Sequence, residues 1–293
     1  MLFLESDSLR TNNRNKARMK IALYSREGCA MGEKRLSSML ERLGKESFDL
    51  YQISGGEDIL PGTDLVMSVG GDGTFLSASQ CVGKSGVPIL GVNLGRLGFL
   101  SEYSPEEACE ALLSGGWYLE DRELLDTKVS DGFPEAEPRF WPFTLNEVSV
   151  HRSGAALLGV DVTIDGHPLP TYWADGLLVA TSSGSTAYSL SVGGPICAPE
   201  AKVLIIAPIA PHNLNARPLV VPDTTRITVS MRSRDEGVML SMDNRNHLID
   251  PSATLDVKVA QFSLKRVRLK NTSFIKALTT KLFWGEDIRN SGE

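Results

Sequence analysis

The sequence predicts two units of different fold: an α/β N-terminal domain with a parallel sheet, and a β-rich, β-sandwich-like C-terminal domain. Between residues 19 and 116, short apolar runs alternate with amphipathic segments, which is typical of a parallel β/α sheet. From about residue 117 the chain becomes a series of short runs rich in valine, isoleucine and threonine. Near its end, Phe274, Leu278 and Leu282 lie four apart and predict a C-terminal helix that returns to the first domain.

The elements of both units can be placed along the chain. In the first unit we expect strands at 20–25, 64–70 and 87–93, and helices at 33–45, 74–84 and 104–116. In the second unit we expect strands at 143–152, 156–166, 176–181, 202–208, 225–232 and 253–260. The predicted organisation is a disordered extension at 1–18, an α/β domain at 19–118 that is completed by 272–293, and a β-rich domain at 119–271.

Charge and composition exclude several classes of protein. The 293-residue chain has a formal net charge of -6, which argues against broad attraction to nucleic acid or to an anionic membrane. Its four cysteines and four histidines show no metal-binding or disulfide spacing, so no metal ligand is assigned and each histidine is expected on the surface or in a loop. The apolar run 203–211 is about half the roughly 20 residues that a membrane span needs. With no signal-peptide core at the N-terminus, we expect a cytoplasmic protein.

One basic segment departs from the acidic balance. Because Val267 and Leu269 alternate with basic residues, the favoured interpretation is a half-buried strand with a solvated basic face, and the alternative is a dedicated anion site. No acidic residue lies between Lys258 and Gly285, whereas this segment holds Lys258, Lys265, Arg266, Arg268, Lys270, Lys276 and Lys281.

The stretch "VGGDGTF" at 69–75 joins an expected strand to an expected helix. Glycines there let the backbone approach a ligand, and the start of the helix favours phosphate. Asp72 is at odds with this, because a carboxylate is repelled by phosphate unless a metal or a substrate hydroxyl offsets the repulsion. A phosphoryl-transfer site supplies both. The alternative is that Asp72 is the N-cap of an ordinary turn.

Further motifs follow this turn in order. They are "GVNLGRLGFL" at 91–100, "LNEVSV" at 145–150, "ADGLLVATSSGSTAYSLSVGGPI" at 174–196 and "APIAPHNLNARPLVVP" at 207–222. From about residue 19 to 284 the chain therefore resembles the NAD kinase family, with the GSTAYSLS and GGPI pair as the most specific part. GGDG alone is shared with lipid kinases and phosphofructokinase-like enzymes. The resemblance implies transfer of a phosphoryl group from ATP to the 2′-hydroxyl of the adenosine ribose of NAD, giving NADP, with a divalent metal, expected to be Mg²⁺, at a site between the two domains.

The resemblance also implies roles for individual residues. Asp72 matches the group that orients or deprotonates the hydroxyl, Asn146 and Glu147 match contacts to adenosine, and Asp175 matches a contact to the dinucleotide that some members make across a subunit interface. The side chains fit, since Asn and Glu offer hydrogen bonds and Tyr188 offers a stacking face, although Tyr188 could also be a core aromatic. The other implied binding residues are Gly70, Gly71, Gly73, Thr74, Asn93, Arg96, Phe99, Ser183, Thr186, Ala187, Tyr188 and Ser191.

Several positions depart from the family pattern. Many relatives have TPTGSTAY where this chain has TSSGSTAY, a basic residue where it has Trp173, histidine where it has Arg96, and DGQ where it has DNR at 243–245. Two other functions are considered: a lipid kinase with the same GGDG turn, which the net acidity disfavours, and a non-catalytic dinucleotide-binding regulator, which Asp72 disfavours. The family resemblance further implies a homodimer or homotetramer.

Overall fold

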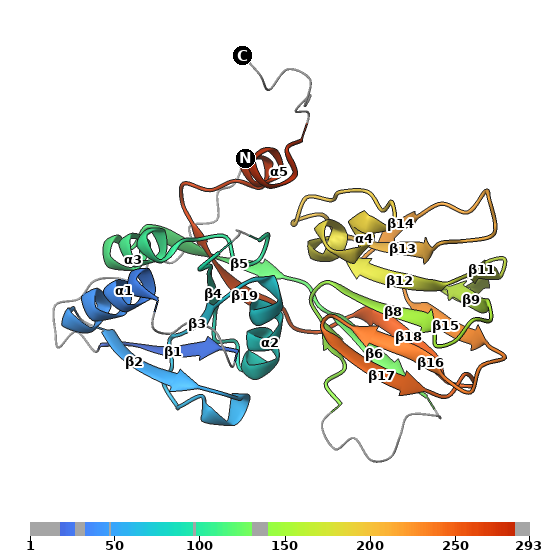
Figure 1. Ribbon diagram of the computed structural model, residues 1–293, viewed down its shortest axis with the longest axis horizontal. Helices are drawn as coiled ribbons and strands as arrows, with labels where there is room; N and C mark the ends of the chain where they lie inside the picture. Colours follow the sequence, from blue (N-terminus) through green and yellow to red (C-terminus); the bar gives the residue numbers. More distant parts are fainter. Residues whose placement is uncertain (1–17, 27–32, 47, 96–97, 131–139, 285–293) are drawn as a thin grey trace.

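The computed structural model describes residues 18–26, 33–46, 48–95, 98–130 and 140–284. The expected extension at 1–18, apart from its last residue, and Arg96 lie outside this part of the chain. No helix in the described ranges is long and apolar enough to cross a membrane. The fold class is confirmed: an α/β domain and a β-rich domain lie side by side, and the final helix stands above the first (Figure 1).

The first domain is built on a six-stranded sheet in the order β2-β1-β3-β4-β19-β5. All neighbours are parallel except β19 and β5, which are antiparallel. Its strands are β1 (Met19–Ser25), β2 (Phe48–Ile53), β3 (Leu65–Val69), β4 (Ile89–Val92), β5 (Trp117–Arg122) and β19 (Leu264–Leu269). The expected division at residues 118 and 271 gives most of β5 and all of β19 to the second unit. In the structure both strands belong to the sheet of the first domain, with β5 at its edge.

Helices cover both faces of the sheet, which keeps its apolar strands from water. α1 (Lys34–Lys45) and α3 (Pro105–Ser114) pack on one face, and α2 (Asp72–Val82) packs on the other. The sequence signals at α3 act as expected, since Ser104 accepts a hydrogen bond from the Glu107 N–H and the helix ends at Gly115 in a left-handed conformation (φ 68°). A short 3₁₀ turn, η1 (Gly56–Asp58), follows β2.

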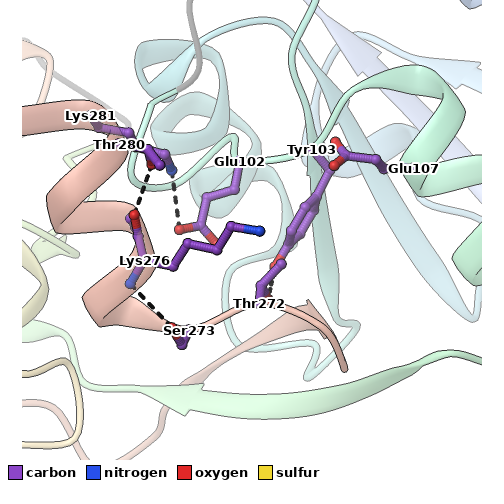
Figure 2. A pocket seen from close by; sticks show the side chains of 9 residues that line it. Glu102, Tyr103, Glu107, Thr272, Ser273, Lys276, Thr280 and Lys281 are labelled. Atoms are coloured by element: carbon purple, nitrogen blue, oxygen red, sulfur yellow. Dashed lines mark hydrogen bonds and ion pairs between the residues drawn. The ribbon is translucent and has the colours of Figure 1, made fainter.

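The C-terminal helix α5 (Phe274–Leu282) lies against the loop that enters α3. It begins after Ser273, whose hydroxyl accepts from the Lys276 N–H, and its Ala277 and Leu278 are buried. Figure 2 shows the pocket between the two segments, with Glu102 and Tyr103 on one side and Lys281 on the other. The predicted return of the C-terminal helix to the first domain is therefore confirmed.

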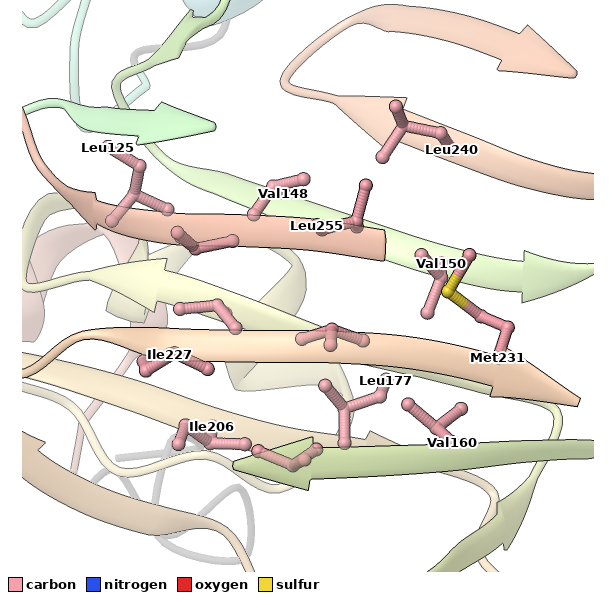
Figure 3. Packing of buried hydrophobic residues seen from close by; sticks show 14 of the residues in the cluster. Leu125, Val148, Val150, Val160, Leu177, Ile206, Ile227, Met231, Leu240 and Leu255 are labelled. Carbon is pink, nitrogen blue, oxygen red and sulfur yellow. The ribbon is translucent and has the colours of Figure 1, made fainter. Parts of the chain in front are cut away.

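The second domain consists of two sheets packed face to face. Their inner faces share one core, to which Val148, Leu177 and Ile206 contribute from one sheet and Val160 and Ile227 from the other (Figure 3). One sheet contains β6 (Leu125–Val129), β7 (Phe143–Thr144), β9 (Leu158–Ile164), β10 (His167–Pro168), β11 (Tyr172–Ala174), β15 (Ile227–Arg232) and β18 (Thr254–Val259). The other contains β8 (Glu147–Arg152), β12 (Gly176–Thr181), β13 (Val203–Ile209), β14 (Leu219–Pro222), β16 (Val238–Met242) and β17 (Arg245–Ile249).

The expectation that the basic face of β19 is exposed to solvent is wrong. The alternation itself is present in β19, where Val267 packs into the core on one face of the sheet. On the opposite face Arg266 and Arg268 are only 2% and 4% exposed, because the loop before α3 covers them. Burial of charged side chains requires partners, and Glu102 in this loop is the partner of both.

Candidate functional site

The glycine turn at 70–73 connects β3 to the first turn of α2. Gly70 has φ 145°, and a Cβ there would lie 2.5 Å from the Thr74 hydroxyl oxygen, so the turn needs glycine at this position. Gly71 is the N-cap and Asp72 the first helical residue. The first N–H groups of a helix have no acceptor within it and form the positive end of its dipole. This turn can therefore receive an anion.

The Asp72 carboxylate holds a second loop. Oδ2 accepts a hydrogen bond from the Phe99 N–H at 2.9 Å, and Oδ1 accepts from the N–H groups of Leu100 at 3.0 Å and Ser101 at 2.8 Å. The contact is close, because a Cβ on Gly98 would lie 2.0 Å from Oδ1. The alternative that Asp72 serves as a helix N-cap is wrong, since Gly71 has that position and the carboxylate faces residues 99–101.

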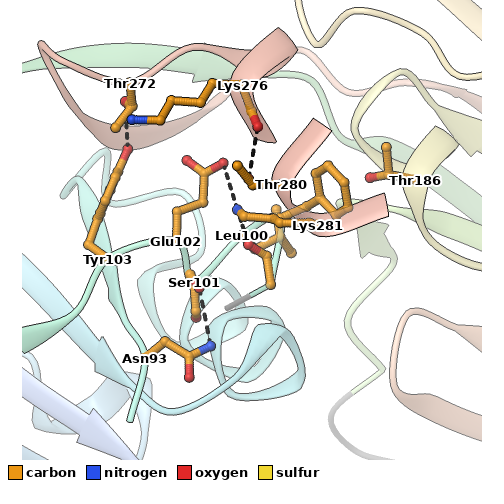
Figure 4. A network of polar contacts seen from close by, with 12 residues as sticks. Asn93, Leu100, Ser101, Glu102, Tyr103, Thr186, Thr272, Lys276, Thr280 and Lys281 are labelled. Carbon is orange, nitrogen blue, oxygen red and sulfur yellow. Dashed lines mark hydrogen bonds and ion pairs between the residues drawn. The ribbon is translucent and has the colours of Figure 1, made fainter. Parts of the chain in front are cut away.

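Two further residues hold the same loop from its other sides. Asn93 accepts from the Gly95 N–H at 2.7 Å and donates to the Ser101 carbonyl at 3.2 Å. Arg266 donates to the carbonyls of Phe99 and Leu100 at 2.9 and 2.8 Å. Figure 4 shows how this network continues from Asn93 through Ser101 to Glu102 and α5. The expected contacts Asn93 and Phe99 are thus both brought next to Asp72.

Glu102 is the centre of a buried charge cluster. Its carboxylate pairs with Arg266 at 2.9 Å, Arg268 at 2.8 Å and Lys281 at 3.2 Å. Although burial opposes its ionisation, these three cations hold the pKa of Glu102 below its usual value. The sequence offered no reason to select Glu102, because its partners come from a strand and a helix more than 150 residues further on.

In the second domain, Asp243 holds the Asn146–Glu147 segment in a similar way. Its carboxylate accepts from the N–H groups of Leu145, Asn146 and Glu147 at 2.8, 2.9 and 3.3 Å. Asp243 has φ 53°, a left-handed conformation that aspartate tolerates in tight turns. The sequence marks residues 243–245 as a departure from the family pattern but assigns them no role.

Asn146 and Glu147 are 7% and 8% exposed, yet each has a side-chain oxygen without a hydrogen-bond partner among the described residues. These oxygens are Asn146 Oδ1 and Glu147 Oε2. Because buried polar atoms are normally satisfied, such atoms suit a ligand. Burial, and then the charge of Asp243, raise the pKa of Glu147 to about 8, opposed by the backbone N–H of Tyr188.

The GSTAY motif lies directly against Asn146. It forms the 3₁₀ turn η2 (Ser183–Thr186), followed by the short helix α4 (Tyr188–Ser191). A Cβ on Gly184 would lie 2.1 Å from the Asn146 carbonyl oxygen, so glycine permits this approach. The predicted residues take different positions: Ser183, Thr186 and Ala187 are half-buried, whereas Ser191 is exposed.

Tyr188, His151 and Asp175 form a group beside Glu147. The Tyr188 ring stacks on the His151 ring with centroids 5.8 Å apart, and it is 36% exposed, so the core-aromatic alternative is wrong. His151 in β8 and His247 in β17 are half-buried in strands, whereas each histidine was expected on the surface or in a loop. Asp175 accepts from Arg152 at 2.6 Å. Arg152 thus provides a cation near Asp175, while Trp173 is 44% exposed.

The turn at 243–245 also joins the two domains. Asn244 donates to the Gly73 carbonyl at 3.2 Å and to the Ser77 hydroxyl at 3.0 Å, and it accepts from Gln80 at 3.2 Å. All three partners belong to α2, which begins at Asp72. The helix that carries Asp72 and the loop that carries Asn146 are therefore held by adjacent residues of one turn.

The structure thus brings several of the expected residues to the junction of the domains. A cavity there is lined by Phe99 and Arg122 of the first domain and by Ser183 and Thr186 of the second. Within the described ranges no group of three or more His, Cys, Asp or Glu side chains could hold a metal by itself.

Comparison with known proteins agrees with this arrangement. Residues 24–114 match the model of the ATP-NAD kinase N-terminal domain, and residues 145–269 match that of the ATP-NAD kinase C-terminal domain. The NAD kinase of Flavobacterium psychrophilum is 40% identical over 251 residues, which is 84% of this chain and 85% of that protein. The NAD kinase of Bacteroides fragilis is 41% identical over 230 residues, or 77% of this chain and 78% of that protein.

Two solved structures share the fold. Yeast NADH kinase complexed with NADH has a TM-score of 0.82 at 22% identity, covering 94% of this chain and 91% of that one. An NAD kinase from Archaeoglobus fulgidus in complex with ATP has a TM-score of 0.69 at 27% identity, covering 86% and 94%. With both domain models matched in order and relatives at about 40% identity over most of the sequence, this chain belongs to the NAD kinase family.

Proposed function

We propose that this protein transfers the terminal phosphoryl group of ATP to the 2′-hydroxyl of the adenosine ribose of NAD, giving NADP. The observation that carries the proposal is the position of Asp72, a carboxylate fixed by three backbone N–H groups at the start of α2, where the helix can receive an anion. The relatives named NAD kinase and the related structure in complex with ATP support the choice of substrates.

Asp72 acts on the acceptor hydroxyl. An ionised carboxylate accepts about four hydrogen bonds, and the three backbone bonds leave one acceptor position on Oδ2. That position receives the ribose hydroxyl and orients its oxygen toward phosphorus. The proton moves to Asp72 late, as the new P–O bond forms in a loose transition state. Because three bonds fix the carboxylate before substrate binds, its orientation costs nothing at the moment of reaction.

The dinucleotide is bound by the second domain. The buried, unpartnered oxygens of Asn146 and Glu147 accept from the adenosine, and the protonated Glu147 that its raised pKa implies can also donate to it. Tyr188 offers an exposed ring for stacking. Since Asn244 connects α2 to the turn that holds these residues, binding of NAD places its ribose relative to Asp72.

A divalent ion, expected to be Mg²⁺, accompanies the donor. Mg²⁺ is commonly bound by one or two carboxylates together with substrate phosphates and water. Among the residues that the structure describes, no group of three or more His, Cys, Asp or Glu side chains could hold the ion alone. The ion would be held by the phosphates of ATP, next to the turn that begins α2. When bound, the ion supplies neutralisation of the phosphate charge.

The direct test is to mix the purified protein with NAD, ATP and Mg²⁺ and to measure NADP with an NADP-specific dehydrogenase. We expect NADP to form only when all three are present. Replacement of NAD by diacylglycerol tests the lipid kinase alternative, for which radiolabelled ATP would label the lipid instead. Binding of NAD without any NADP formation would contradict the proposal and favour a non-catalytic regulator.

A further inference from the structure

The buried basic face of β19 and β5 faces the junction of the two domains. In the antiparallel register Arg266 lies opposite Glu120 and Leu264 opposite Arg122, so Arg122, Arg266 and Arg268 share one face of the sheet. All three side chains are at most 5% exposed. Three guanidinium groups are thus concentrated behind the loop that contacts Asp72.

Positive charge exceeds negative charge in this cluster. Arg266, Arg268 and Lys281 share the single carboxylate of Glu102, and Arg122 pairs with Glu120 at 2.7 Å. Four cations therefore meet two carboxylates. With Asp72 beyond the loop also counted, one of these positive charges has no counterpart among the residues that the structure describes. Since uncompensated buried charge is costly, this excess requires an explanation.

The arginines also keep unused hydrogen-bond donors. The Nε atoms of Arg266 and Arg268 are buried and have no partner among the described residues. The three arginines line one cavity together with Ser183 and Thr186, and Arg122 donates to the Ser183 hydroxyl at 3.3 Å. Burial, followed by the neighbouring charge of Arg266, lowers the pKa of Arg122 to about 10. An anion in this cavity would relieve both the repulsion and the unpaired donors.

We propose that Arg122, Arg266 and Arg268, with the hydroxyls of Ser183 and Thr186, form a subsite for a phosphate group. The inference rests on the proposed function in one respect: the phosphate belongs to a substrate of the transfer reaction, either the polyphosphate of ATP or the pyrophosphate of the dinucleotide. Arginine suits this task because its fixed fork of donors matches phosphate oxygens. The subsite places that phosphate on the far side of residues 99–100 from Asp72.

The test uses the full chain and inorganic tripolyphosphate as probe, with binding measured by titration calorimetry at fixed ionic strength. Arg268→Met removes one guanidinium but leaves Glu102 paired with Arg266 and Lys281. Lys265→Met is the matched control, because it removes one positive charge from an exposed position of the same strand. We expect Arg268→Met to weaken binding by about tenfold or more, since hydrogen bonds to charged groups are individually strong. Lys265→Met should bind as the wild type does.

If circular dichroism shows that Arg268→Met is unfolded, Arg122→Met takes its place, with the same expected loss. No binding of tripolyphosphate to the wild type, or equal binding by the wild type and the folded arginine variant, overturns the proposal. Competition identifies the source of the phosphate: displacement of the probe by ATP indicates the donor, and displacement by NAD indicates the dinucleotide. Displacement by neither would show that no substrate phosphate occupies the subsite and would also overturn it.

The binding test is independent of turnover. A protein that binds tripolyphosphate through these arginines but forms no NADP would contradict the proposed function and leave the anion subsite in place. A protein that forms NADP with unchanged KM for ATP and for NAD in Arg268→Met would contradict the subsite alone.

Discussion

Asp72 in the first domain and Asp243 in the second hold two loops by the same geometry but in different charge surroundings. Each carboxylate accepts hydrogen bonds from three successive backbone N–H groups, at residues 99–101 and 145–147 respectively. Next to the first loop, Glu102 faces three cations and its pKa is lowered. In the second, Glu147 is buried beside Asp243 and its pKa is raised to about 8.

The difference shows that an aspartate in such a turn fixes backbone positions, while its neighbours decide which groups are charged. In the first loop the network leaves an ionised, cation-rich site suited to phosphate. In the second loop it leaves neutral, buried hydrogen-bonding groups suited to a nucleoside. One turn, through Asp243 and Asn244, contacts both regions.

The largest expected effect is that of Asp72→Asn on turnover. The amide keeps the size of the side chain but cannot accept a proton, and its NH₂ group opposes the loop N–H groups. We expect kcat to fall by about 10²–10⁴-fold while NAD still binds. Steady-state NADP formation and NAD titration test this, with the exposed Asp64→Asn as control, since Asp64 also accepts from a backbone N–H. Near-normal kcat in Asp72→Asn would remove Asp72 from the chemistry.

The second effect concerns stability. Glu102→Gln removes the carboxylate with which Arg266, Arg268 and Lys281 pair, and loss of one partner from a buried ion cluster costs about 3 kcal/mol or more. Urea unfolding should show this decrease in the free energy of unfolding. Glu110→Gln breaks an exposed pair with Arg42 and should change stability little. Equal stability of the two variants would show that the cluster does not need Glu102.

A smaller change is expected for Asp243→Asn. One amide oxygen cannot replace the carboxylate on three N–H groups, so we expect a loss of about 2 kcal/mol of stability. KM for NAD should rise more than kcat falls, because Asp243 positions Asn146 and Glu147 and does not touch the reacting atoms. Asp165→Asn is a matched control, as Asp165 also has positive φ and accepts from a backbone N–H. A fall in kcat at unchanged KM would contradict a positioning role.

The most gradual effect is the pH dependence of the free energy of unfolding that results from the raised pKa of Glu147. Its pKa in the folded protein is about 8, above the usual value of 4.5, so the folded chain holds a proton that the unfolded chain has released between these values. The stability that Glu147 contributes is fully present below its pKa in the unfolded chain. It is lost as the pH rises toward its pKa of about 8 in the folded protein. We expect the free energy of unfolding to fall by about 1 kcal/mol per pH unit in this window. Glu147→Gln should remove this slope, and parallel profiles for the two proteins would contradict a raised pKa.

Much of the site could be predicted because its motifs are local. The glycine turn, the NE pair and the GSTAY segment each require particular residues at fixed spacing, for steric reasons that Gly70 and Gly184 illustrate. The hydrogen bonds of Asp72 could not be predicted in the same way. That it binds the backbone of residues 99–101 depends on the approach of a loop 27 residues away.

The sequence by itself determined the two fold classes, the alternation of strands and helices between residues 64 and 116, and the glycine turn, because periodicity and steric demands act over short stretches of chain. It did not show β2, or that β5 and β19 belong to the first sheet. Only the tertiary structure decided that Arg266 and Arg268 are buried, that Glu102 and Asp243 hold the site, and that His151 stacks on Tyr188. Burial and charge pairing depend on what covers a residue, and here the covering segments come from distant parts of the chain.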